Sequence, residues 1–226
     1  MRDDRGVSEI VGFVIVFGII IGSVGILSVV GFQSMDDYQQ GEQMQNAERA
    51  FDALADNFND IQRNDGIQTR ASEINLREGT ISVEDGTELT IAVDGSTIWS
   101  DHLGSFTYEK GDTTIAYEGG GVFRGQGDGS IEVKEPMLKC GDNAAIVSLV
   151  NIEGDPPRLQ STDGREIEAS KVETEVWTGD EVDVVIEDSD LYENGWERVL
   201  DRKFDGGNCD DVDRVTVRIT TIEIDY

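Results

Sequence analysis

The feature that most constrains this chain is an uninterrupted apolar run over residues 10–32. The run contains no charged, amide or proline residue, and its only polar side chains are the hydroxyls of Ser23 and Ser28. A helix of that length rises roughly 30 Å, which matches the hydrocarbon thickness of a bilayer. The sequence therefore predicts one transmembrane helix, with bounds at residues 7–33.

The residues before the run predict a short leader that is cut in front of the apolar helix. A secretory signal peptide has a shorter apolar core, and its cleavage site follows that core. Here the cleavage point is expected between Gly6 and Val7, directly after Arg5. Removal of residues 1–6 would leave the apolar helix on the mature protein.

The junction at residues 4–12, with the sequence DRGVSEIVG, resembles the class III signal peptide of archaeal type IV pilins. Residues 104–113 and 115–124 are also similar to pilin-like surface proteins of haloarchaea. The resemblance implies processing by a prepilin-type peptidase and association with other pilin-like subunits or with itself. It differs from bacterial type IV pilins, which place a glutamate fifth in the mature chain, because Glu9 would be third here.

The charge balance indicates an environment more than an activity. The chain has 47 acidic and 18 basic residues and a net charge of −29. Such a field repels a polyanion, so nucleic acid is not an expected partner. An acidic disordered chain does not fit the 38% apolar content. A calcium-loaded surface protein remains open, and adaptation to molar salt, as in halophilic archaea, is favoured because salt screens the repulsion.

The flanks of the apolar run predict a topology. Arg2 and Arg5 precede the run, whereas Asp36 and Asp37 follow it. The positive-inside rule counts arginine and lysine, and not net charge. The N-terminus is therefore expected in the cytoplasm, with the C-terminal domain extracellular, on a single-pass membrane protein or a surface filament.

After the run, residues 34–65 predict an amphipathic helical extension. Apolar residues recur there at spacings of three and four, which is typical of a helix with one narrow apolar stripe. The stripe consists of Met44, Ala47, Phe51, Leu54, Phe58 and Ile61. It is expected either to pack on the protein's own exterior domain or to form a seam between subunits. The turn-forming residues Asn64, Asp65 and Gly66 end the helix.

Residues 66–226 predict a β-rich extracellular domain. Short runs alternate between apolar and polar residues, and Asp-Gly and Lys-Gly pairs between them favour antiparallel hairpins. The expected strands cover residues 81–84, 89–93, 97–100, 105–108, 113–117, 130–133, 145–150, 172–177, 182–186 and 212–226. Asp85-Gly86 is expected to turn the chain. A β-bulge is expected at Thr220-Thr221, because the apolar residues change there from odd-numbered to even-numbered positions.

One short helix interrupts these strands. Asp190 and Glu193 form a capping pattern, and Gly206-Gly207 closes the helix. Its aromatic face, which includes Trp196, is expected to be core. The predicted fold class is α+β, with a long N-terminal helix followed by a mainly antiparallel, sandwich-like β domain and one short helix.

The sequence contains few of the residues and motifs that enzymes use for catalysis. His102 is the only histidine, and the residues on either side of it predict an exposed turn. No nucleophile elbow, phosphate-binding lysine motif or zinc-binding helix motif occurs. The glycines of residues 119–129 favour a flexible hairpin, and the aspartates of residues 205–213 lack the order of an EF-hand. No cofactor, no metal and no enzymatic activity are predicted.

The two cysteines, Cys140 and Cys209, predict a disulfide. The pair is even and the domain is expected to lie outside the cell, where the bond is stable. Two buried free thiols are the alternative.

Three glycines in the apolar run predict a helix-packing face. Gly18 and Gly22 are four residues apart and Gly25 follows three later, so all three lie near one side of a helix. In lipid, small residues let two helices approach closely. Glycines that merely permit curvature are the alternative.

Two functions of different classes follow from these patterns. The first is a pilin-like or pseudopilin-like surface subunit that assembles through its N-terminal helix. The second is a single-pass anchored extracellular binding module that does not assemble. The junction at Gly6-Val7 favours the first, because a simple anchor does not need it.

Overall fold

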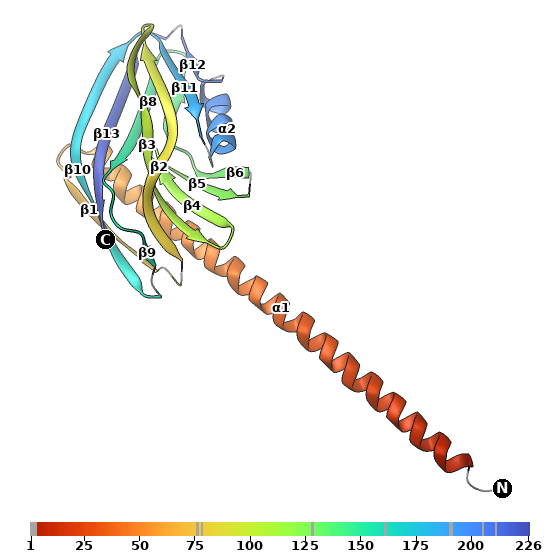
Figure 1. The fold of residues 1–226 in the computed structure, drawn as a ribbon. Coiled ribbons are helices and arrows are strands. Elements are labelled where there is room, and N and C mark those ends of the chain that lie inside the picture. Colours follow the sequence, from red (N-terminus) through yellow and green to blue (C-terminus); the bar gives the residue numbers. More distant parts are fainter. Residues whose placement is uncertain are drawn as a thin grey trace. The chain divides into compact units, whose positions relative to one another are not determined.

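The computed structural model, drawn in Figure 1, has two compact units, Met1–Gln45 and Asn46–Tyr226. The structure describes residues 4–75, 77, 79–127, 129–160, 162–189, 192–204, 206–210 and 212–226, and no side chains at 4–9 and 29–40. One helix, α1 (Asp4–Arg63), supplies most of the first unit and the beginning of the second. The second unit thus includes the last turns of α1, a division that differs from the boundary at residue 65 expected from sequence.

The second unit contains two β-sheets and a short helix. The first sheet has the order β1 (Thr69–Asn75), β10 (Gly164–Gly179), β13 (Val215–Asp225), β8 (Ala145–Glu153), β7 (Met137–Cys140). The second has the order β12 (Asn208–Cys209), β11 (Val182–Asp188), β2 (Thr80–Val93), β3 (Ser96–Lys110), β4 (Thr113–Glu118), β5 (Gly121–Gln126), β6 (Gly129–Lys134), with β9 (Leu159–Gln160) beside β2. The helix α2 (Glu193–Phe204) contacts β6, β7 and β11 (Figure 1).

This architecture confirms the predicted α+β class. Every strand pair in the described part of the chain is antiparallel except β8 with β13, which run parallel. Buried residues from both sheets and from α2 form one core cluster. The sheets approach closely at Gly104, where an added Cβ would lie 1.9 Å from the carbonyl oxygen of Ile152. Only glycine fits at this crossing.

The turn chemistry predicted two connections correctly. α1 ends at Arg63, and a turn follows at Asp65 and Gly66. Asp94 and Gly95 both have positive φ, of 50° and 72°, and connect β2 to β3. A two-residue turn with positive φ at both positions matches the twist of a hairpin.

Two predictions on β2 and β3 were wrong. Asp85-Gly86 does not reverse the chain; it lies inside β2, where the register to β3 shifts between Asp85 and Glu88. His102 lies within β3 and not in a turn. The reason lies in the pairing of the strands. β3 pairs with β2 on both sides of Asp85-Gly86, so β2 continues through the pair, which forms a β-bulge in place of a turn.

The predicted bulge at Thr220-Thr221 was also misplaced. The irregularity lies on the partner strand, between Lys171 and Glu173 of β10. β13 itself is continuous, and both threonines are buried. Because β13 is continuous, Ile219 and Ile222 face opposite sides of the sheet, and residues 219–222 are all buried, so both faces of the sheet are covered there.

Candidate functional site

The first candidate site is the apolar part of α1. The segment Ile10–Ser28 is long and apolar enough to cross a membrane, with a mean hydropathy of 2.8. Every residue in it is exposed, including large side chains such as Phe13 and Leu27, each 70% exposed. Such a surface is stable only in lipid or against other protein. The predicted cleavage point, Gly6–Val7, lies in the first turns of α1.

The three glycines of this segment form an open strip. A Cβ added at Gly18, Gly22 or Gly25 would meet nothing within 4 Å. Helical geometry places the three within one narrow sector, as the sequence predicts. A larger side chain at any of the three positions would therefore not disturb the described residues.

The apolar stripe of the extension is core of the second unit. Ala47, Phe51, Leu54, Phe58 and Ile61 are buried, the last four completely. Phe51 stacks on Phe106 of β3 with ring centroids 5.5 Å apart, and Phe58 meets the edge of Tyr117 of β4 at 5.4 Å. Met44 belongs to the first unit and is only partly buried. Of the two alternatives for the stripe, packing on its own domain holds for these five residues.

Basic residues of the sheets reinforce this packing. Lys134 of β6 donates to Asp52 and Asp56 of α1 at 2.9 and 2.7 Å, and Arg124 of β5 pairs with Glu48 at 2.8 Å. These ion pairs are partly exposed, so each adds little stability. Their acidic partners Glu48, Asp52 and Asp56 are four residues apart, so the three pairs lie along one side of the helix.

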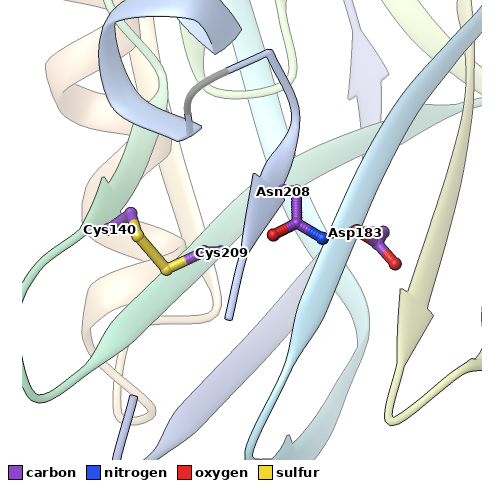
Figure 2. Close-up of a disulfide and its surroundings, with 4 residues drawn as sticks. All are labelled: Cys140, Asp183, Asn208 and Cys209. Atoms are coloured by element: carbon purple, nitrogen blue, oxygen red, sulfur yellow. Dashed lines mark hydrogen bonds between the residues drawn. A yellow bond between two sulfur atoms is a disulfide. The ribbon is translucent and has the colours of Figure 1, made fainter. Parts of the chain in front are cut away.

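The predicted disulfide between Cys140 and Cys209 is present (Figure 2). Cys140 ends β7, at the edge of the first sheet, and Cys209 lies in β12, at the edge of the second. Beside it, the side-chain amide of Asn208 donates to the Asp183 carboxylate of β11. The bond therefore joins the two sheets covalently at their edges.

The remaining sequence candidates are structural. Trp196 is fully buried and stacks on Phe123, with ring centroids 5.1 Å apart. Gly119 and Gly120 form the turn between β4 and β5, where both have positive φ. Asp190, Asp205 and Asp211 lie outside the described residues. Within the described ranges, no group of three or more His, Cys, Asp or Glu residues is placed to hold a metal ion.

A cavity that the sequence did not indicate lies beside the bulge of β2. Its volume is about 310 Å³, and its lining includes Glu84, Asp85, Ser105, Asp188 and Tyr192. We call it the acidic cavity. Such a volume is at the lower end of that typical of small-molecule sites.

A polar row across three strands begins in the lining of the acidic cavity and continues into the core. Register pairs Glu84 of β2 with Ser105 of β3, and Ser105 with Glu118 of β4. Directly paired residues share one face of a sheet, so the three side chains lie in a line. Glu84 also accepts from Ser82 at 2.8 Å and from Arg158.

Glu118 is the most unusual group of this row. It is fully buried, and its Oε1 accepts a 2.7 Å hydrogen bond from the indole of Trp196. Burial raises the pKa of Glu118 above its ordinary value of 4.5, and the neighbouring Thr87, Trp196 and Ser105 oppose this only in part.

We expect Glu118→Gln to stabilise the protein, and to do so more at high pH. The folded chain holds the Glu118 proton more tightly than the unfolded chain, so stability falls as pH rises from 4.5 through the raised pKa. Glutamine keeps the oxygen that accepts from Trp196 and cannot ionise. The gain should be small at pH 4 and about 1–3 kcal/mol at pH 8, measured by denaturant unfolding.

The matched control for this substitution is Glu175→Gln on β10, where the side chain is exposed. It makes the same change of charge without burial, and its unfolding free energy should stay within about 0.5 kcal/mol of the parent. A Glu118→Gln gain that is equal at pH 4 and pH 8 would show that the folded carboxyl does not titrate abnormally.

His102 stands at the rim of the acidic cavity. Its Nδ1 lies 3.1 Å from the carbonyl oxygen of Gly86, and its Nε2 lies 3.9 Å from Glu88. The hydrogen bond to Gly86 is the main cause that raises the pKa of His102, and Glu88 adds to it. His102 therefore contacts the bulge of β2 at Gly86 and lies near Glu88.

Sequence reasoning missed this row because its members are far apart in the chain. Only the register of β2, β3 and β4 brings Glu84, Ser105 and Glu118 together. One signal was available: Glu118 follows an otherwise apolar and threonine-rich strand and precedes the glycine turn. A carboxylate at the end of a buried strand points to a polar site.

Comparison with known proteins gives one match. No curated protein and no solved structure matches this chain. A family model described as "Family of unknown function (DUF7289)" matches residues 5–225, which is nearly the whole chain. The match begins at Arg5, before the apolar segment, and so includes both units. The chain therefore belongs to the DUF7289 family.

Proposed function

We propose that the protein is a pilin-like or pseudopilin-like cell-surface subunit, anchored or assembled through the N-terminal part of α1. The observation that carries this proposal is the segment Ile10–Ser28, which is apolar on all sides and exposed throughout. A simple anchor would account for the apolar surface. The open glycine strip and the Arg5-Gly6-Val7 junction are additional features that suit assembly and processing.

The second unit suits a role outside the cell. A disulfide that joins two sheets persists in oxidising surroundings and is rare in the cytosol. The net charge of −29 keeps the displayed surface hydrated and suits a salt-rich medium. In this proposal, the N-terminus is cytoplasmic and Asn46–Tyr226 is extracellular.

Processing of the leader is the first test. We expect a prepilin-type peptidase to cut between Gly6 and Val7, so that the native protein begins Val7-Ser8-Glu9. Intact-mass measurement of the protein from its native membrane checks this. Arg5→Ala with Gly6→Leu should abolish cleavage, while Asp3→Asn serves as the control that leaves it unchanged. A native protein that retains Met1 or Arg2 would favour the non-assembling anchor.

Association through the glycine strip is the second test. Gly22→Leu places a bulky side chain on the strip and keeps the segment apolar, so membrane insertion and the β domain should persist. We expect crosslinked dimers or filaments to fall at least fivefold, because close helix approach is lost.

The matched control is Ile21→Leu, which alters the neighbouring position without changing its size class. It should associate like the parent protein. Unchanged association of the Gly22→Leu protein would exclude this strip as the contact.

The second candidate function is a membrane-anchored binding module that does not assemble. One observation favours it, namely the acidic cavity. Uncut leader, monomeric behaviour in the membrane and ligand binding at this cavity would together support it over the pilin-like subunit.

A further inference from the structure

We propose that a second copy of this chain binds the outer face of the first sheet, beyond the end of α1. Such a contact would give the proposed surface subunit a second place of association. It rests on that proposed function, because copies anchored in one membrane can meet there. The strands that form this face are β7, β8, β13 and β10.

Strand register places eight side chains on this face in two rows. Residues directly paired across neighbouring strands share one face of a sheet. The first row consists of Lys139, Ile146, Thr216 and Thr178. The second row consists of Met137, Ser148, Arg218 and Val176. We call these two rows the open face.

The open face points away from the core cluster. Successive residues of a strand point to opposite faces of its sheet. The residues that alternate with the two rows on β7, β8 and β13 are Leu138, Val147 and Val217, and all three belong to the buried core. The two rows therefore lie on the outer side of the first sheet.

α1 ends at the border of the open face. The next row along β8 and β13 contains Val150 and Thr220, which are completely buried. The Arg218 guanidinium donates to the Gln62 carbonyl at 3.0 Å, in the last turn of α1, which ends at Arg63. Cover by the helix therefore stops at Arg218.

Three large apolar side chains are exposed on the open face. Met137, Ile146 and Val176 are 44%, 40% and 51% exposed. Met137 and Ile146 are diagonal neighbours on adjacent strands, so their side chains are within reach of each other. Because the three residues come from three strands, the apolar surface extends across the sheet and a partner would remove it from water.

Charge selects the occupant. The open face contains no carboxylate, although the chain has 47 acidic residues and a net charge of −29. Its charged members are Lys139, which is exposed, and Arg218, which pairs with Asp65 at its border. Two such acidic copies repel each other in most orientations, whereas this face attracts an acidic protein surface. A second copy in the same membrane supplies such a surface.

The open face is small for a contact that acts alone. Four strands about 4.8 Å apart and two rows about 7 Å apart cover far less than the roughly 800 Å² that each partner buries in a stable complex. Anchoring in one membrane raises the effective concentration of the copies, so that a weak contact is occupied. We therefore expect the contact in membranes.

The test is zero-length carbodiimide cross-linking, which joins a lysine amine to a carboxylate, on the full-length protein in zwitterionic lipid vesicles. Half of the copies carry a heavy nitrogen isotope, so that mass spectrometry separates links between copies from links within one copy. We expect peptides that join Lys139 of one copy to a carboxylate of another. Links from Lys139 that stay within single copies would overturn the proposal.

Val176→Glu and Val185→Glu form a matched pair of variants. Val185 lies on β11 of the second sheet and is 48% exposed, much like Val176. Val176→Glu adds a carboxylate to the open face, so links from Lys139 between copies should fall at least fivefold, while Val185→Glu should leave them unchanged. Both variants should keep the melting temperature of the parent protein. If Val176→Glu melts lower, Thr178→Glu, at an exposed position of the same face, repeats the test.

The possible results separate this contact from the proposed function. Links from Lys139 that are equal in the parent and the Val176→Glu protein would show only random collision and would exclude the open face. Association that depends on Gly22 without any such link would do the same and leave the pilin-like subunit standing, whereas a parent without either would contradict both proposals. Protection of Lys139 from acetylation by added dextran sulfate, without links between copies, would show that the occupant is an acidic polysaccharide instead.

Discussion

Replacement of both Cys140 and Cys209 by alanine is expected to lower the free energy of unfolding of the second unit by about 4 kcal/mol. The bond spans 69 residues of chain, and in the chain-entropy model its loss releases a large loop in the unfolded state. Denaturant unfolding of the oxidised parent and the double variant measures the difference. The loss should appear first in β12, which has only two residues and lies at a sheet edge.

The control for this experiment is reduction of the parent protein under the same conditions. Reduced parent and double variant should unfold at similar denaturant concentrations, because both lack the cross-link. Alkylation of the denatured, unreduced parent should leave its mass unchanged. Two added alkyl groups would show that the native protein holds free thiols.

Phe58→Ala is expected to destabilise the second unit by about 3–5 kcal/mol. The ring is fully buried and packs edge-on against Tyr117, so its removal leaves a cavity between α1 and β4. Denaturant unfolding of the detergent-solubilised protein, followed by tryptophan fluorescence, measures the change. The same substitution tests whether the apolar stripe packs within one subunit or at a contact between subunits.

Val176→Ala is the matched control, because Val176 is 51% exposed on β10. It should cost less than about 1 kcal/mol. If Phe58 instead formed a seam between subunits, Phe58→Ala would leave monomer stability unchanged. Its effect would then depend on protein concentration.

Local patterns in the sequence predicted the elements whose chemistry is local. The apolar segment at residues 10–28 needs no tertiary partner to be recognised, because its length and composition alone suit a bilayer. The stripe from Ala47 to Ile61 was found by helical spacing, and all five of its members in the second unit are buried. The paired cysteines, Cys140 and Cys209, likewise needed only their number and the expected compartment.

The same local reasoning failed where strand pairing overrides turn chemistry. Asp94-Gly95 and Asp85-Gly86 are both Asp-Gly pairs, yet one is a hairpin turn and the other a bulge inside β2. The sequence of each pair cannot distinguish them. The difference arises because β3 extends far enough to pair with both halves of β2.

The sequence by itself thus determined an apolar segment long enough to cross a membrane, the helix that follows it, the β-rich class and the disulfide, because each can be read from composition, local spacing or the number of cysteines. Only the tertiary structure decided that the helix stripe is core, and that Glu84, Ser105 and Glu118 share one row. Their meeting depends on strand register, which is set by the packing of the whole sheet. The acidic cavity is a product of that register.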